Sequence, residues 1–251
     1  MNITWDADQY TKEFSFVHQY GQEVLSLLTL DETTTVLDLG CGNGALTKKL
    51  SATGARAIGL DDSEELLQIA REHYPELTFI QANAVDFTLA EPVDAVFSNA
   101  VFHWIEREQQ PGLLHSIYAA LKDGGQLVFE FGGHGNNQLI HTALRSVFTA
   151  RGLDYELPFY FPTIGEYASL LEQAGFQVSY MSRFDRRTAL SGPQGLADWI
   201  KMFVQKPFAG LAEADKAAII QEAAVLLQEA LLADGVWYAD YVRLRGRAVK
   251  A

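Results

Sequence analysis

A glycine-rich stretch, "VLDLGCGNGALTKKL" at positions 36–50, is the first candidate for chemistry in this sequence. Gly40, Gly42 and Ala45 satisfy the spacing GxGxxA between an apolar, strand-like run and a helix-like run. Glycines at this spacing let the backbone approach a ligand closely, and Asp61 follows 21 positions after Gly40, where an acid binds ribose hydroxyls. The pattern therefore predicts a nucleotide-like ligand, and taken alone it fits a nicotinamide dinucleotide.

Asp38 distinguishes between the candidate ligands that the glycine pattern leaves open. It lies two positions before Gly40, where a pyrophosphate would approach the following helix. A carboxylate there repels a phosphate and attracts a cation. S-adenosylmethionine carries a sulfonium and an ammonium group and no phosphate, so we expect Asp38 to face its methionine part, directly or through a water. Asp61 would then accept hydrogen bonds from the ribose hydroxyls.

Five stretches resemble the class I S-adenosylmethionine-dependent methyltransferases in order and spacing, and they span about half of the chain: "VLDLGCGNG", "AIGLDDSEELLQIAR", "FIQANAVDF", "VDAVFSNAVFHWI" and "LKDGGQLVFEF". Within this family the sequence looks closest to the small-molecule and acyl-carrier branch, which includes the trans-aconitate and malonyl-carrier methyltransferases. The resemblance implies S-adenosylmethionine as the cofactor. It also implies a small-molecule or acyl acceptor, with a carboxylate or hydroxyl oxygen favoured.

The same resemblance assigns the cofactor-binding positions, which are Asp38, Gly40, Cys41, Gly42, Asn43, Asp61, Asp62, Asn83, Ala84 and Ser98. Asn83 stands where the family usually places an aspartate that accepts from the adenine amino group, and its amide oxygen can still accept. Ser98 resembles the position whose backbone touches the amino-acid part of the cofactor. We interpret Cys41 as a small residue in a tight turn, not as a nucleophile.

His103, in "NAVFHWI", follows the fourth predicted strand at the edge where open parallel sheets bind ligands. It is therefore the candidate catalytic residue, as a general base toward a hydroxyl or amine. The alternative is that His103 and Trp104 only pack over the cofactor. A carboxylate acceptor is already ionised and needs no base, because alignment and desolvation then supply the acceleration. Arg183, Arg186 and Arg187 could pair with such an acid, or could form a solvated basic face.

Strand-like and helix-like segments alternate from residue 33 to residue 180, which is typical of the α/β class. The predicted helices are 45–53, 63–73, 112–122 and 164–173. The predicted strands are 35–39, 57–60, 78–81, 94–98, 126–131, 176–181 and a last stretch at 236–250. We expect a Rossmann-like, doubly wound, mostly parallel seven-stranded sheet with an antiparallel last strand.

We interpret residues 1–251 as one methyltransferase domain with two helical additions. The first is an amphipathic N-terminal segment, 1–30, in which Tyr10, Phe16 and Tyr20 could wall a pocket or serve helix packing. The second is a block at 193–232, which we interpret as a helical cap over the acceptor site. Its large side chains could line the substrate or only join the helices, and they are Trp199, Met202 and Phe203.

Composition limits the partners. The 19 Lys and Arg against 32 Asp and Glu give a net charge of −13, which argues against nucleic acid and anionic membranes. The lone Cys41 permits no internal disulfide and no cysteine-built metal site, so no metal is predicted. No apolar run is long enough to span a membrane, and "MNITWDADQYTKEF" lacks the features of a signal peptide, so we expect a cytoplasmic protein.

Two alternatives to a methyltransferase stay open at this point. The first is an NAD(P)-dependent oxidoreductase on a Rossmann sheet, against which Asp38 argues. The second is a protein that binds S-adenosylmethionine, or its demethylated product, without turning it over. The sequence leaves the oligomeric state open.

Overall fold

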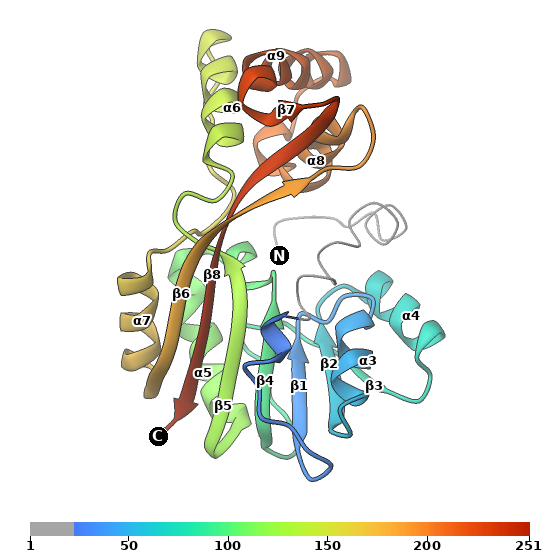
Figure 1. The fold of residues 1–251 in the computed structure, drawn as a ribbon, viewed down its shortest axis with the longest axis vertical. Coiled ribbons are helices and arrows are strands. Elements are labelled where there is room, and N and C mark those ends of the chain that lie inside the picture. Colours follow the sequence, from blue (N-terminus) through green and yellow to red (C-terminus); the bar gives the residue numbers. More distant parts are fainter. Residues whose placement is uncertain (1–22) are drawn as a thin grey trace.

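A single mixed β-sheet forms the centre of the computed structural model, which describes residues 23–251 (Figure 1). The strand order is β3-β2-β1-β4-β5-β8-β6, and β7 pairs with β8 outside this path. The strands are β1 (Thr35–Leu39), β2 (Arg56–Asp61), β3 (Thr78–Gln81), β4 (Val93–Asn99), β5 (Leu121–Gly132), β6 (Phe176–Ala189), β7 (Leu232–Ala233) and β8 (Val236–Lys250). The first five strands run parallel to one another, and β8 is antiparallel to both β5 and β6. The predicted α/β sheet with an antiparallel last strand is thus confirmed, with the short β7 added.

Helices follow most of the strands. They are α3 (Ala45–Ser51), α4 (Glu64–His73), α5 (Gln110–Ala120), α6 (Gln138–Ala150), α7 (Ile164–Gln173), α8 (Gly195–Phe203) and α9 (Glu213–Leu231), with the short 3-10 turns η1 (Phe102–Trp104), η2 (Arg107–Gln109) and η3 (Lys206–Phe208). The Ser63 hydroxyl accepts a hydrogen bond from the backbone N–H of Leu66 and caps α4, as its residue type predicts. Within residues 23–251, no helix has the length and apolar character that crossing a membrane demands.

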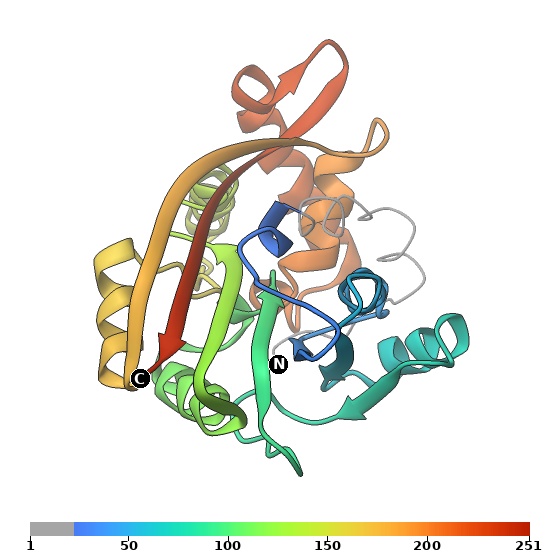
Figure 2. The same cartoon turned by 60° about the horizontal axis from the view of Figure 1, so that its bottom comes forward.

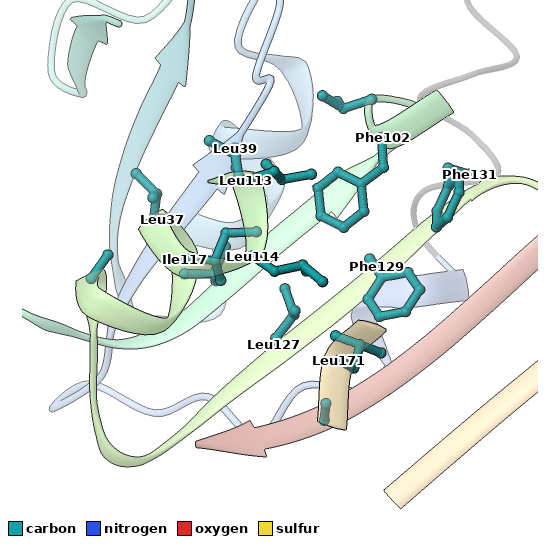
Figure 3. Packing of buried hydrophobic residues seen from close by; sticks show 14 of the residues in the cluster. Leu37, Leu39, Phe102, Leu113, Leu114, Ile117, Leu127, Phe129, Phe131 and Leu171 are labelled. Atoms are coloured by element: carbon teal, nitrogen blue, oxygen red, sulfur yellow. The ribbon is translucent and has the colours of Figure 1, made fainter. Parts of the chain in front are cut away.

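Both faces of the parallel sheet are covered. Because successive side chains of a strand point to opposite faces, Val36 and Leu37 of β1 enter different clusters. Leu37 packs with Leu113 of α5 and Phe129 of β5 in the cluster of Figure 3, and Val36 packs with Leu50 of α3. This double burial fixes the carboxyl ends of β1, β2 and β4 along one edge of the sheet.

The strands β6 and β8 continue beyond the rest of the sheet. β8 pairs with β5 only from Arg243 to Val249, but with β6 out to Tyr238. The outer part of this two-stranded ribbon reaches α8 and α9, with α6 beside α9, as Figures 1 and 2 show. Trp199 of α8 donates a hydrogen bond from Nε1 to the hydroxyl oxygen of Tyr241 at 2.6 Å, which ties this helical part to β8. The helices α8 and α9 occupy the block 193–232 that the sequence suggests as a cap.

Three features differ from the sequence-based expectations or lie outside the description. Helix α6 was not predicted, although Ile140, Leu144 and Val147 repeat at helical spacing, because it starts after Asn137 without a side-chain cap. β6 runs eight residues beyond the predicted end, to Ala189, because β8 stays paired with it. The pocket-wall candidates Tyr10, Phe16 and Tyr20, with most of the segment 1–30, lie outside the described residues.

Candidate active site

Two adjoining cavities lie at the carboxyl edge of the parallel strands. The first, here named the carboxylate cavity, encloses about 790 Å³ including space open to solvent, and its wall includes Asp61, Asp62 and Asn83. The second, here named the aromatic cavity, encloses about 760 Å³ on the same measure. Both are lined by Gly40, Asp61, Val101 and Trp104. We therefore describe them as two halves of one site.

Asp61, at the end of β2, stands between the two halves and is buried. Its Oδ2 accepts a hydrogen bond from the backbone N–H of Gly42 at 2.8 Å, and its Oδ1 accepts one from the N–H of Ser63 at 3.0 Å. Burial raises the pKa of Asp61 to about 6, against the lowering effect of these two N–H donors. Each carboxylate oxygen keeps a further lone pair, so Asp61 can hold the glycine loop and still accept from a ligand hydroxyl.

The glycine loop itself is closely packed. The N–H groups of Gly40 and Cys41 both donate to the carbonyl of Leu60, at 2.7 and 3.0 Å. Gly40 has a φ of +76°, and a Cβ placed on it would lie 2.2 Å from Cγ2 of Val101. Only glycine therefore fits at this point, which is the reason for its type. Cys41 and Asn43 of the same loop are buried and line neither cavity.

Asp38 occupies a different place from the one its charge predicts. Its side chain is buried, its Oδ2 accepts a hydrogen bond from the Thr47 hydroxyl at 2.6 Å, and it is not part of either cavity wall. Burial raises the pKa of Asp38 to about 7, opposed by the Thr47 bond and aided by the negative charge of Asp61. The carboxylate is thus only partly ionised at neutral pH, and its attraction for a cationic ligand stays a prediction.

Asn83 and Ala84 follow β3 and line the carboxylate cavity, where the resemblance places the adenine. The Asn83 Oδ1 accepts a hydrogen bond from the backbone N–H of Val85 at 2.9 Å, which fixes the orientation of the amide. Ser98, in contrast, points away, because its hydroxyl donates to the carbonyl of Leu39 at 2.8 Å and its side chain lines neither cavity. The next residues, Asn99 and Ala100, are in the wall of the aromatic cavity.

His103 lies in η1 and lines the aromatic cavity. Its Nδ1 faces the backbone N–H of Gly132 at 3.3 Å and accepts from it, so the neutral ring carries its proton on Nε2. Burial, with the positive charge of Arg243, holds the pKa of His103 well below its usual range. With Nδ1 accepting from Gly132 and the proton on Nε2, the neutral ring keeps no free nitrogen lone pair for a proton, which does not favour the predicted role of general base.

Arg243 of β8 is a charged site residue that the sequence analysis missed, and Asn136, Asn137, Phe159, Phe161 and Tyr241 of the same wall were missed as well. It lines the aromatic cavity, is only 6% exposed, and its guanidinium lies 4.3 Å from the centre of the Tyr241 ring. Gly132, which donates to His103, is also the β5 partner of Arg243 in the sheet register. The antiparallel pairing of β8 with β5 thus brings Arg243 beside His103. A signal was present in "DYVRLR", whose Arg243 and Arg245 share one face of a strand, but the sequence does not show the register of that strand or what its faces meet.

The three arginines proposed from the sequence lie elsewhere. Arg183 pairs with Asp185 at 3.1 Å on the surface, and Arg187 lies over the ring of Tyr238. Arg186 binds the buried carboxylate of Glu130 on β5. None of the three lines either cavity, so their suggested pairing with an acidic acceptor finds no support.

Of the large side chains of the block 193–232, Trp199 and Phe203 line the aromatic cavity, whereas Met202 is buried in the cluster that joins the helices. Trp199 and Phe203 share this cavity wall with Trp104, Phe159 and Phe161, which come from other parts of the chain.

Comparisons with known proteins agree on the class. The family model of a methyltransferase domain matches residues 36–125. An uncharacterized methyltransferase of Schizosaccharomyces pombe is 30% identical over 256 residues, covering 96% of each chain. A trans-aconitate 2-methyltransferase of Azoarcus sp. is 36% identical over 129 residues, covering 51% of this chain and 50% of that protein. The matched stretch thus covers about half of each protein.

Solved structures show the same fold. A Bacillus halodurans protein described as a methyltransferase has a TM-score of 0.66 at 17% identity, covering 92% of this chain and 99% of that one. A Haemonchus contortus phosphoethanolamine N-methyltransferase, solved with S-adenosylhomocysteine, has a TM-score of 0.57 at 18% identity, covering 94% and 56%. The chain belongs to the class I S-adenosylmethionine-dependent methyltransferases. It is similar over half of its length to trans-aconitate methyltransferases, and the comparisons give no support to the oxidoreductase alternative.

The residues present fit S-adenosylmethionine. The carboxylate cavity offers acceptors for ribose hydroxyls at Asp61 and Asp62, and amide groups for an adenine edge at Asn83. The ionisable side chains among the described residues of its wall are those of Asp61, Asp62 and Glu106, and an acidic wall disfavours a pyrophosphate. The glycine loop connects this half to the aromatic cavity through Gly40, and Gly42 lines the aromatic cavity.

Proposed function

We propose that this methyltransferase modifies a carboxylate oxygen of a small molecule bound in the aromatic cavity. The observation that carries the proposal is the buried guanidinium of Arg243 in the wall of that cavity, next to the glycine loop. A guanidinium presents several N–H donors in a plane that matches a carboxylate, even when one donor has another partner. The Azoarcus relative is named for an acid, trans-aconitate, which agrees with an acidic acceptor.

The cofactor side of the proposal assigns roles to the carboxylate cavity and the loop. Asp61 and Asp62 would hold the ribose, and Asn83 with Ala84 the adenine. The backbone from Gly40 to Asn43 would pass beside the methionine part. Asp38 would act behind this loop, through α3, and not by direct contact. Ser98 would support the end of β1 through Leu39.

The acceptor side depends on Arg243 and His103. Arg243 would bind and orient the carboxylate, and the Nε2–H of His103 would donate a second hydrogen bond to it. The aromatic walls would exclude water from the reacting oxygen. The bound cofactor supplies an electrophilic methyl group, and its carbon–sulfur bond breaks, with the electron pair left on sulfur, as the new carbon–oxygen bond forms. A carboxylate is ionised at neutral pH, so no proton has to be removed.

A hydroxyl acceptor is the second candidate, because the sequence left it open. It would need a base, and His103 is the titratable side chain next to Arg243 in the cavity wall. With Nδ1 engaged by Gly132 and the ring buried, His103 would have to become a buried cation beside Arg243. The geometry therefore favours the carboxylate.

The test uses radiolabelled S-adenosylmethionine and a panel of carboxylic acids and alcohols. A methyl ester releases its label as methanol in alkali, whereas a methyl ether keeps it. We expect alkali-labile product, and we expect Arg243→Gln to reduce kcat/KM for it by at least about tenfold, as the loss of a charged hydrogen bond predicts. The matched control is Arg183→Gln, which removes an arginine from the exposed pair with Asp185. Alkali-stable product alone, or equal effects of both variants, would contradict the proposal.

A further inference from the structure

We infer that the acceptor is an acid with a single carboxylate on a flat, apolar body, such as an aryl or conjugated monocarboxylic acid, and not a polycarboxylate. This inference rests on the proposed function, because it presupposes that Arg243 binds the acceptor's carboxylate. It adds the shape and the number of charges that the other residues of the cavity select in the acceptor.

The walls of the aromatic cavity are flat and apolar. Six aromatic rings line it, from Trp104, Phe159, Phe161, Trp199, Phe203 and Tyr241. The rings of Phe159 and Phe161 are stacked, with centroids 5.3 Å apart, and Trp104 meets Phe159 edge to face at 4.9 Å. Such rings stack on a planar apolar group and gain little from an anionic one, because their faces are electron-rich. The shape and chemistry of the wall therefore select a planar body.

The charges of the cavity allow for only one carboxylate. Among the described residues that line it, Arg243 is the one permanent cation and Asp61 the one carboxylate. His103 does not add a charge, because burial and Arg243 keep it neutral. A second carboxylate of the acceptor would lose its water among aromatic rings, with no described cation of the wall left to pair with it. The electrostatics therefore disfavour a di- or tricarboxylate.

Two amide side chains complete the polar part of the wall. The Asn136 Oδ1 accepts a hydrogen bond from the backbone N–H of Val242 at 2.9 Å, which fixes that amide beside Arg243. Asn137 lines the cavity, is 2% exposed, and its Oδ1 is buried without a hydrogen-bond partner. A buried amide oxygen without a partner calls for a donor, and it repels a carboxylate. The amide of Asn137 therefore suits a neutral donor on the ligand, such as a hydroxyl.

Binding to the enzyme saturated with S-adenosylhomocysteine tests the inference without turnover. The probes are trans-cinnamate, 4-carboxycinnamate, which adds a second carboxylate to the same body, and 3-cyclohexylpropanoate, which replaces the flat ring by a puckered one. We expect calorimetric titration to give cinnamate a Kd at least about tenfold below those of both other acids. Equal or tighter binding of 4-carboxycinnamate would overturn the single-carboxylate inference, and equal binding of the cyclohexyl acid would overturn the flat body.

Two variants locate the selectivity. Arg243→Gln should weaken the binding of cinnamate, with a rise in Kd of at least about tenfold. Phe159→Leu should reduce the preference for cinnamate over 3-cyclohexylpropanoate while leaving the preference over 4-carboxycinnamate in place, because only the stacking wall changes. The wild-type titrations need no variant, so misfolding of either variant leaves the inference testable.

Product analysis on the same probes separates this inference from the proposed function. Alkali-labile label on 4-carboxycinnamate, and none on cinnamate, would leave carboxylate methylation standing and overturn the inference. Label confined to the alcohols of the panel that tests the proposed function would overturn that function, and the inference with it. Binding and ester formation with cinnamate supports both.

Discussion

The carboxylate of Asp61 accepts a hydrogen bond from the backbone N–H of Gly42 at 2.8 Å while it lines both halves of the site. One side chain thus shapes the glycine loop and lines the cavity in which we propose that the cofactor binds. Asp61→Asn keeps the size but removes the charge, and a hydrogen bond to a charged group contributes about 1.5–3 kcal/mol. We expect affinity for S-adenosylhomocysteine to fall about 10-fold to 150-fold in calorimetric titration.

The pKa of Asp61 adds a second observable. Because this pKa is raised to about 6, the carboxylate that accepts from the ribose is lost as the pH falls through that value. Wild-type affinity should therefore drop between about pH 7.5 and pH 5, and Asp61→Asn should lack most of this dependence. Asp123→Asn, which changes a 95% exposed side chain, is the control. A pH dependence that is the same in Asp61→Asn and the wild type would rule out this assignment.

Gly124 provides a matched control for an alanine substitution at Gly40 of the glycine loop. Their φ angles are +76° and +75°, so alanine carries a similar backbone cost of about 1–2 kcal/mol at either position. Only at Gly40 would the new Cβ meet a neighbour, with Val101 Cγ2 at 2.2 Å. We expect Gly40→Ala to lower the free energy of unfolding by more than Gly124→Ala does, and to weaken cofactor binding, because Val101 lines both cavities.

The double variant Gly40→Ala with Val101→Ala checks the cause of that difference. If the clash is responsible, the second substitution should recover part of the lost stability, which urea unfolding of the four proteins of the cycle measures. Equal destabilisation by the two glycine substitutions would show that close packing at Gly40 plays no part.

His103→Gln tests the donor role against the base role. Because the pKa of His103 lies well below its usual range, the ring stays neutral, and kcat should show no ionisation of this group between about pH 6 and pH 8. Loss of one neutral donor should lower kcat by roughly tenfold. Loss of a general base would instead lower kcat by about two to four orders of magnitude. A loss of that size, with a pH-rate profile that changes shape in the variant, would restore the general base.

Asp38 should make the stability of the ligand-free enzyme depend on pH in an unusual direction. Its folded pKa is raised to about 7, so between about pH 4 and pH 7 the folded state holds a proton that the unfolded state has released. The free energy of unfolding contributed by this group therefore falls as the pH rises through that window and levels off above about pH 7. Asp61 contributes in the same direction between about pH 4 and pH 6.

Asp38→Asn isolates the first of these contributions. The amide keeps an oxygen for the Thr47 hydroxyl and cannot ionise. We expect the variant to gain stability relative to wild type as the pH is raised from about 5 to about 8, in urea unfolding at each pH. A constant difference over this range would show that Asp38 has an ordinary pKa in the folded state.

The sequence by itself determined the parts of the site that are local. The strand, glycine loop and helix from Thr35 to Ser51 follow from apolar and glycine patterns, and Asp61 follows from its place at the end of the next parallel strand. Parallel strands joined by helices have their carboxyl ends at one edge, so the sequence was enough to predict that these groups and His103 meet there.

Only the tertiary structure decided the acceptor side. Arg243 enters the cavity because β8 lies antiparallel between β5 and β6, with Arg243 opposite Gly132. A shift of one residue in such a pairing turns every side chain to the other face, and β6 contains a register shift between Val178 and Tyr180. The pattern of arginines could not show that this face of β8 meets the cavity at Arg243. The charge of Asp38 was likewise decided by burial, because desolvation depends on what surrounds a carboxyl group and not on its place in a motif.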